Sequence, residues 1–156
     1  MGLDMYLRVD KSGYEYDFSK PAEKKVYAEV RKSLGIPADK KFEAPSAHVS
    51  LNVAYWRKAN AIHGWFVREC QGGKDECQES YVSVEKLKEL RGRCERVLKD
   101  RTQAPELLPT EGGFFFGSTD YDENYMEDLK LTVEQLDYIL KTFVGEGFSF
   151  YYQSSW

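Results

Sequence analysis

Polar and hydrophobic positions alternate in some segments of the chain and recur every three or four residues in others. Alternation with a period of two is typical of strands and predicts them over residues 3–9, 47–54, 79–82 and 148–156. Helical spacing predicts helices over residues 21–34, 55–70, 84–100 and 132–142. We therefore expect a single α+β domain over residues 1–156, with a mostly antiparallel sheet of four or five strands and three or four packed helices.

The stretch before the last predicted helix has weaker signals. Residues 105–109 are expected to form a loop, and three phenylalanines between glycines predict a short apolar strand over residues 114–116. A capping box, with Thr132 at the cap and a glutamine three residues later, predicts that the last helix begins there.

Acidic residues follow the glycine-bracketed phenylalanines. A glycine-rich loop before a helix can hold phosphate through backbone amides. Here Asp120, Asp122 and Glu123 would oppose an anion. The sequence therefore favours a capping role, in which Ser118, Thr119 or Asp120 begins a helix with an acidic first turn.

The segment predicted as a helix over residues 55–70 combines an apolar stripe with hydrogen-bonding side chains. The stripe is formed by Tyr55, Ala59, Ile62, Phe66 and Cys70. The candidate ligand-binding residues beside it are Trp56, Arg57, Lys58, Asn60, His63 and Trp65. The cationic side chains and the histidine can meet phosphate or carboxylate oxygens, the amide can read a polar edge, and a tryptophan can stack on a base-like ring.

Two further features bear on a binding site. Gly64 interrupts the same predicted helix, which indicates close approach by another backbone or a ligand, or tight packing against a strand. His48, Ser50 and Asn52 share one face of the strand predicted over residues 47–54. These three side chains either line a wet cleft or face solvent, as the polar face of a half-buried strand normally does.

Composition limits the partners. With 22 basic and 26 acidic residues the formal charge is −4, and no one-sided basic cluster suits duplex nucleic acid. No apolar run approaches the roughly 20 residues that cross a bilayer, and the first residues do not match a signal peptide. We therefore expect a cytoplasmic protein without a membrane partner. Cys70, Cys77 and Cys94 lack the spacing of a zinc knuckle, so reduced thiols and no metal or cofactor are expected.

Four motifs together resemble a family of small proteins encoded mainly by bacteriophages and prophages. They are the start Met1-Gly2-Leu3-Asp4-Met5-Tyr6-Leu7, the run from Tyr55 to Val67 (YWRKANxIHxWFV), the loop Gly113-Phe114-Phe115-Phe116-Gly117-Ser118 and the end Tyr152-Gln153-Ser154-Ser155-Trp156. They span nearly the whole chain. The resemblance implies a phage context, and hence the cytoplasm of a host cell, but it transfers no activity and no catalytic residue.

Three functions fit these observations. The first is an accessory protein that binds a small polar or anionic ligand, such as a nucleotide, on the segment 55–70 without turnover, for example to sequester a signal of host defence. The second is an interaction module that inhibits a host protein through an aromatic surface. The third is a small hydrolase that uses His63 or the acidic residues 120, 122 and 123; no nucleophile-elbow pattern supports it, so the sequence leans against an enzyme.

Overall fold

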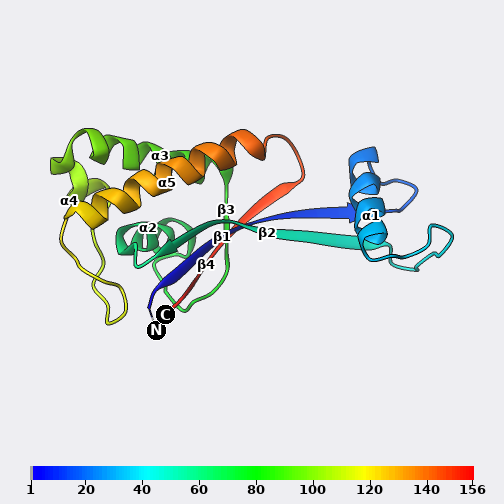
Figure 1. Ribbon diagram of the computed structural model, residues 1–156, viewed down its shortest axis with the longest axis horizontal. Coiled ribbons are helices and arrows are strands. Elements are labelled where there is room, and N and C mark those ends of the chain that lie inside the picture. Colours follow the sequence, from blue (N-terminus) through cyan, green and yellow to red (C-terminus); the bar gives the residue numbers. More distant parts are fainter. Residues whose placement is uncertain (1) are drawn as a thin grey trace.

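The computed structural model describes residues 2–156, so Met1 of the family-like start lies outside the described residues. The elements in chain order are β1 (Asp4–Tyr14), α1 (Pro21–Ser33), β2 (Ser46–Arg57), α2 (Asn60–Cys70), β3 (Ser80–Val82), α3 (Val84–Lys99), a 3-10 turn (Arg101–Gln103), α4 (Ala104–Leu107), α5 (Glu123–Thr142) and β4 (Phe148–Ser155). The strands form one antiparallel sheet in the order β2-β1-β4-β3. The predicted α+β class is confirmed (Figure 1).

The sheet has a covered part and an extended arm. Strand β4 pairs with β1 over Asp4–Lys11, whereas β2 follows β1 as far as Tyr14. Figure 1 shows β1 and β2 running together beyond the layer of α3 and α5 and ending at α1. At that end Gly13 allows α1 to approach closely, because a Cβ there would lie 2.5 Å from the backbone nitrogen of Tyr27.

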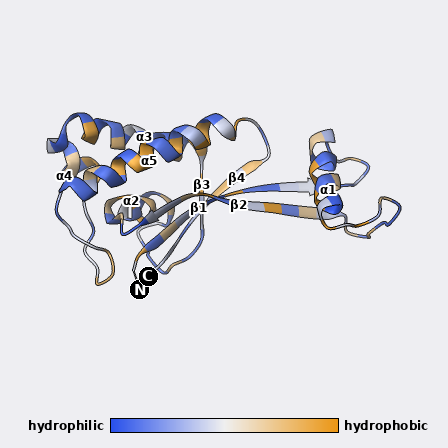
Figure 2. Cartoon of the chain, viewed as in Figure 1, coloured by the Kyte–Doolittle hydropathy of each residue, from blue (hydrophilic) through white to orange (hydrophobic). Residues whose placement is uncertain are grey.

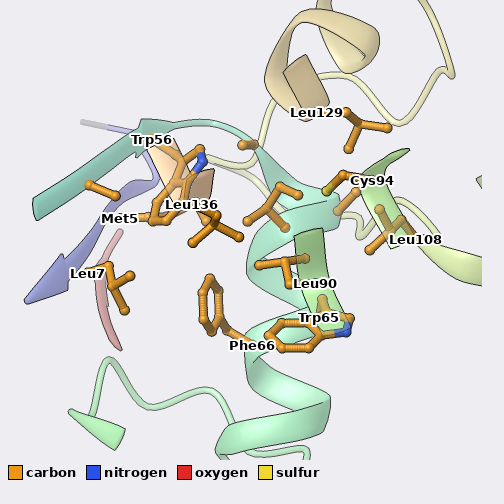
Figure 3. Close-up of a cluster of buried hydrophobic side chains, with 14 of the residues drawn as sticks. Met5, Leu7, Trp56, Trp65, Phe66, Leu90, Cys94, Leu108, Leu129 and Leu136 are labelled. Carbon is orange, nitrogen blue, oxygen red and sulfur yellow. The ribbon is translucent and has the colours of Figure 1, made fainter. Parts of the chain in front are cut away.

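The core lies under the helical layer. Alternate residues of β1 and β4 are buried as their pattern predicts, among them Met5, Leu7 and Tyr152. Figure 3 shows Trp56 of β2 and Trp65 and Phe66 of α2 within the same cluster of hydrophobic side chains. Helix α3 adds its buried stripe of Leu87, Leu90, Cys94 and Val97, and Ser83 caps it by accepting from the Lys86 amide at 3.2 Å.

The helix predicted to begin at Tyr55 begins at Asn60 instead. Tyr55, Trp56 and Arg57 belong to β2 and pair with Tyr6, Met5 and Asp4 of β1. The apolar spacing of this segment fits a helix, but hydrogen bonding to a neighbouring strand forty or more residues earlier decides its structure. The chain then turns at Lys58, whose φ of 59° is left-handed.

Several local predictions near the C-terminal half were also wrong. Helix α5 begins at Glu123, with Asp122 as its cap, and Thr132 lies inside it rather than at its start. Short helix α4 occupies part of the predicted loop 105–109, with Pro105 in its first turn, where the missing amide costs nothing. Residues 114–116 form a turn and not a strand.

The far half of β2 differs from the half-buried strand that its alternation predicts. His48, Ser50 and Asn52 face solvent, but Val49 and Leu51 are exposed as well. The reason is that this half of β2 lies in the arm, beyond the layer formed by α3 and α5 (Figures 1 and 2). Only toward Ala54 and Trp56 does β2 enter the core.

Candidate functional site

A cleft of about 350 Å³ opens where β2 passes into α2. One wall is formed by residues 57–62, and the other by residues between Gly117 and Leu129, in the loop before α5 and the first turns of that helix. We call it the α2 cleft. Its volume lies in the range of small-molecule sites, and it contains Arg57 and Lys58 of the predicted ligand-binding set.

The first wall attracts anions. The side chains of Arg57 and Lys58 are exposed, and the chain enters α2 at Ala59, which has no side chain that could cap the helix. The first helical hydrogen bond of the helix runs from the His63 amide to the Ala59 carbonyl. The amides of Ala61 and Ile62 precede it and have no acceptor within the helix. Two cations therefore stand at the positive end of a helix dipole.

The opposite wall is acidic. Asp120 and Glu127 are exposed, and Asp122 uses one carboxylate oxygen to cap α5, accepting from the Tyr125 amide at 3.0 Å. Asp128 is partly buried, and this burial raises the pKa of its carboxyl to about 6, with a further contribution from the negative charge of Asp122. The α2 cleft thus presents opposite charges on its two walls.

Lys58 holds a strained backbone at the mouth of this cleft. Its φ of 59° is a conformation that residues with a Cβ rarely adopt. The conformation is fixed by neighbours: the Lys58 amide donates to the Leu3 carbonyl at 2.8 Å, and its carbonyl accepts from the Asn60 amide at 2.9 Å. Such strain is concentrated at functional positions, where the surrounding structure holds it in place.

Asn60 organises the cleft instead of reading a ligand. Its buried carboxamide donates to the carbonyls of Phe116 and Ser118, at 3.0 and 2.7 Å, and accepts from the Glu111 amide at 3.1 Å. These three bonds occupy the side chain and fasten the loop 111–118 against α2. Asn60, which the sequence predicted to read a polar edge of a ligand, therefore positions part of the acidic wall.

His63 lies away from the α2 cleft, beside a smaller hollow of about 220 Å³. It is buried, and its Nε2 lies 2.9 Å from Asp75 Oδ2 while its Nδ1 lies 2.8 Å from the Tyr152 hydroxyl. A carboxylate can only accept, so Nε2–H donates to Asp75, while Nδ1 shares its hydrogen bond with the hydroxyl of Tyr152. Burial raises the pKa of Tyr152 well above its ordinary value, which keeps that hydroxyl protonated. Both ring nitrogens are occupied, so His63 is no free base.

The two predicted tryptophans lie in the core. Trp56 is 1% exposed and Trp65 is 0% exposed, so neither ring offers a face to a ligand. Trp56 donates its indole N–H to the Thr132 hydroxyl at 2.9 Å. The ring-stacking role expected of these residues is therefore not available in this structure.

Gly64 and the three cysteines lie in surroundings that the sequence did not settle. A Cβ on Gly64 would meet the side chain of Glu111, which is ion-paired with Arg68, so this side chain occupies the space beside the glycine. The three cysteines are free. Burial raises the thiol pKa to about 11 for Cys70 and about 12 for Cys94, so both are poor nucleophiles at neutral pH.

The sequence missed Asp128, Asp75 and Tyr152. Asp128 carried no signal because an acidic residue early in a helix is common. Asp75 and Tyr152 are 12 and 89 residues from His63, too far for a spacing pattern. The sequence predicted Ser118, Thr119 or Asp120 as the cap of this helix and placed Asp122 in its acidic first turn, but Asp122 is the residue that caps α5, and none of these residues was predicted to line a cleft.

Comparisons with protein-family models, curated proteins and solved structures found no match. Across residues 2–156, no helix is long and apolar enough to cross a membrane. Within the same range, no three histidine, cysteine or acidic side chains are grouped so that they could share a metal ion.

Proposed function

We propose that this protein binds, without turnover, a small ligand with an anionic group in the α2 cleft, and that a nucleotide carrying a single phosphate is its best candidate. The observation that carries the proposal is the pairing of opposite charges across a cleft of about 350 Å³. A phosphate would lie toward Arg57, Lys58 and the free amides of α2.

The acidic wall restricts the rest of the ligand. Carboxylates such as Asp120 and Asp128 accept hydrogen bonds, so they suit ribose hydroxyls or an exocyclic amino group. They would repel a second or third phosphate that extended across the cleft. Because both tryptophans are buried, such a ligand would be held by its polar edges rather than by ring stacking.

Binding without turnover is favoured by the absence of an activated nucleophile around the cleft among residues 2–156. His63, the base proposed from sequence, is engaged by Asp75 and Tyr152 and lies beside a different hollow. The resemblance to phage-encoded proteins suggests a use for such binding. Sequestering a nucleotide signal of the host's defence would require tight capture and no chemistry.

Native mass spectrometry of the protein as purified, against its denatured mass, tests for a retained ligand. Calorimetric titration with a nucleoside monophosphate, the matching nucleoside and inorganic phosphate then tests the charge assignment. We expect the monophosphate to bind and the nucleoside to bind at least about tenfold more weakly, the effect of losing a charge-assisted contact.

Arg57→Ala should weaken monophosphate binding by at least about tenfold, whereas Lys41→Ala, an exposed cation of the arm, should leave it unchanged. No retained ligand and no binding across the panel would overturn the proposal. Release of a chemically altered nucleotide would overturn the claim that there is no turnover.

A further inference from the structure

The outer edge of β2 is open along most of its length. Strand β2 forms one edge of the sheet, with β1 as its single neighbour. At Tyr55 the edge is closed by Gln135 of α5, whose amide accepts from the Tyr55 N–H at 2.9 Å and donates to its carbonyl at 3.4 Å. Over residues 47–53, backbone groups that point away from β1 have no partner within the described part of the chain.

Over residues 46–52 this edge lacks the usual protection against strand pairing. Exposed edges are normally shortened, covered, or marked with charges or proline. Residues 46–53, Ser-Ala-His-Val-Ser-Leu-Asn-Val, contain no proline and no lysine, arginine, aspartate or glutamate. One extra residue at Val53 interrupts the register, but residues 46–52 pair regularly with β1. The opposite edge, β3, is by contrast only Ser80–Val82.

The same part of β2 exposes an apolar surface. Val49 is 36% exposed and Leu51 is 55% exposed, and both line an apolar groove of about 380 Å³. The groove runs over the sheet between Val26 and Val30 of α1 and Phe148 of β4. Figure 2 shows hydrophobic residues on β2 within the arm, away from the helical layer. A molecule bound to this surface must supply hydrogen bonds to the strand edge and must also cover the apolar side chains.

We propose that the occupant is a second copy of this chain, and that the two β2 strands pair antiparallel about a two-fold axis at Ser50. Side chains alternate between the faces, so this register places Val49 opposite Leu51 of the second copy and keeps both on the groove side. His48 then lies opposite Asn52 of the second copy on the other face. The pairing joins two four-stranded sheets into one continuous sheet.

The absence of charged residues over positions 46–53 explains why this part of β2 can pair with a second copy of itself. A two-fold interface brings each surface against its own copy, so a charged strand would set like charges side by side. The uncharged segment 46–53 avoids this cost. Next to the axis, the Ser50 hydroxyl donates to Asp10 at 2.6 Å, and the Asp10 carboxylate is neutralised by Arg8 at 2.8 Å. The two copies therefore meet without an unpaired charge at the axis.

Sedimentation velocity of the full chain from roughly 1 to 100 μM tests the association, since interfaces of limited area dissociate in this range. We expect a reversible monomer–dimer equilibrium. Leu51→Lys introduces the charge by which natural edge strands avoid pairing and should raise the dissociation constant at least about tenfold. Leu131→Lys, at a 42% exposed position of α5, is the matched control and should leave it unchanged.

Cysteine crosslinking tests the register. Ser50→Cys should form a disulfide-linked dimer on mild oxidation, because the two cysteines would face each other across the axis. Asn52→Cys should not, since its counterpart would be displaced by four residues, about 13 Å along the strand. The wild-type chain, which retains its three cysteines, serves as the control. Circular dichroism melting of each variant verifies folding.

Three results would overturn the proposal. A wild-type chain that stays monomeric throughout the concentration range would exclude the second copy as occupant. A dimer unaffected by Leu51→Lys would place the interface elsewhere. Equal crosslinking of the two cysteine variants would exclude the axis at Ser50. None of these depends on the α2 cleft, so this proposal and the proposed function fail separately.

Discussion

Trp56 and Thr132 are joined by a buried hydrogen bond, in which the indole Nε1 donates to the threonine hydroxyl at 2.9 Å. The hydroxyl in turn donates to the Asp128 carbonyl at 2.7 Å. Both side chains are at most 1% exposed. The bond fixes the end of β2 against the middle of α5, and these two elements carry opposite walls of the α2 cleft.

Replacing Thr132 with valine should destabilise the fold by about 1–3 kcal/mol, because the shape is kept while the buried indole N–H loses its acceptor. Thr132→Ser, which retains the hydroxyl, should cost less. Urea unfolding with an unchanged denaturant slope measures the difference. Equal stability of the valine and serine variants would show that the hydroxyl contributes nothing.

Asn60→Ala should destabilise the protein by about 2–4 kcal/mol, since three hydrogen bonds to the loop 111–118 are lost at once. The same loop should become more sensitive to limited proteolysis. The matched control is Asn124→Ala, an exposed asparagine lining the same cleft, which should change stability by less than about 0.5 kcal/mol. An unchanged cleavage pattern in Asn60→Ala would contradict the positioning role.

Lys58→Gly should raise stability by about 0.5–1 kcal/mol, because glycine adopts a φ near 59° without steric cost. It should also weaken ligand binding, because it removes a cation from the α2 cleft. Cys77→Gly is the control, since Cys77 is also left-handed, with a φ of 55°, but lies outside the cleft. It should raise stability without altering binding. Thermal unfolding and calorimetric titration of both variants measure these effects. Equal losses of ligand affinity in Lys58→Gly and Cys77→Gly would argue against binding in the α2 cleft.

Asp128 should make stability depend on pH. Its folded-state pKa of about 6 is raised above that of an unfolded aspartate, near 4, so the folded chain holds this proton more tightly. The stabilisation from this group is therefore fully present below about pH 4 and is lost as the pH rises through about 6.

Asp128→Asn has no carboxylate to bury, so the loss of folding stability as the pH rises through about 6 should disappear. At neutral pH the variant should be more stable than the wild type by about 1–2 kcal/mol, a figure reduced for partial exposure of the side chain, and the difference should vanish below about pH 4. Chemical unfolding at a series of pH values measures it. Asp120→Asn, at an exposed position of the same wall, is the control and should change stability by less than about 0.5 kcal/mol.

Local periodicity alone determined the fold class and most of the elements. The alternation of Met5, Leu7 and Val9 matches their burial in β1, and the spacing of Leu87, Leu90 and Cys94 matches the buried face of α3. Such patterns can be read without a structure because each element must turn one side toward the core, and that side repeats with the element's own period. The cationic half of the candidate site, Arg57 and Lys58, was singled out by residue type, although periodicity placed both residues in a helix that begins only at Asn60.

Tertiary structure decided everything that depends on a partner distant in the sequence. Tyr55–Arg57 form a strand because β1 supplies their hydrogen bonds, and Thr132 lies within a helix where its hydroxyl meets Trp56. The acidic wall faces Arg57 only because α5 packs against the start of α2. The sequence holds these charges sixty or more residues apart, and no local pattern reports which distant side chains a fold will bring together.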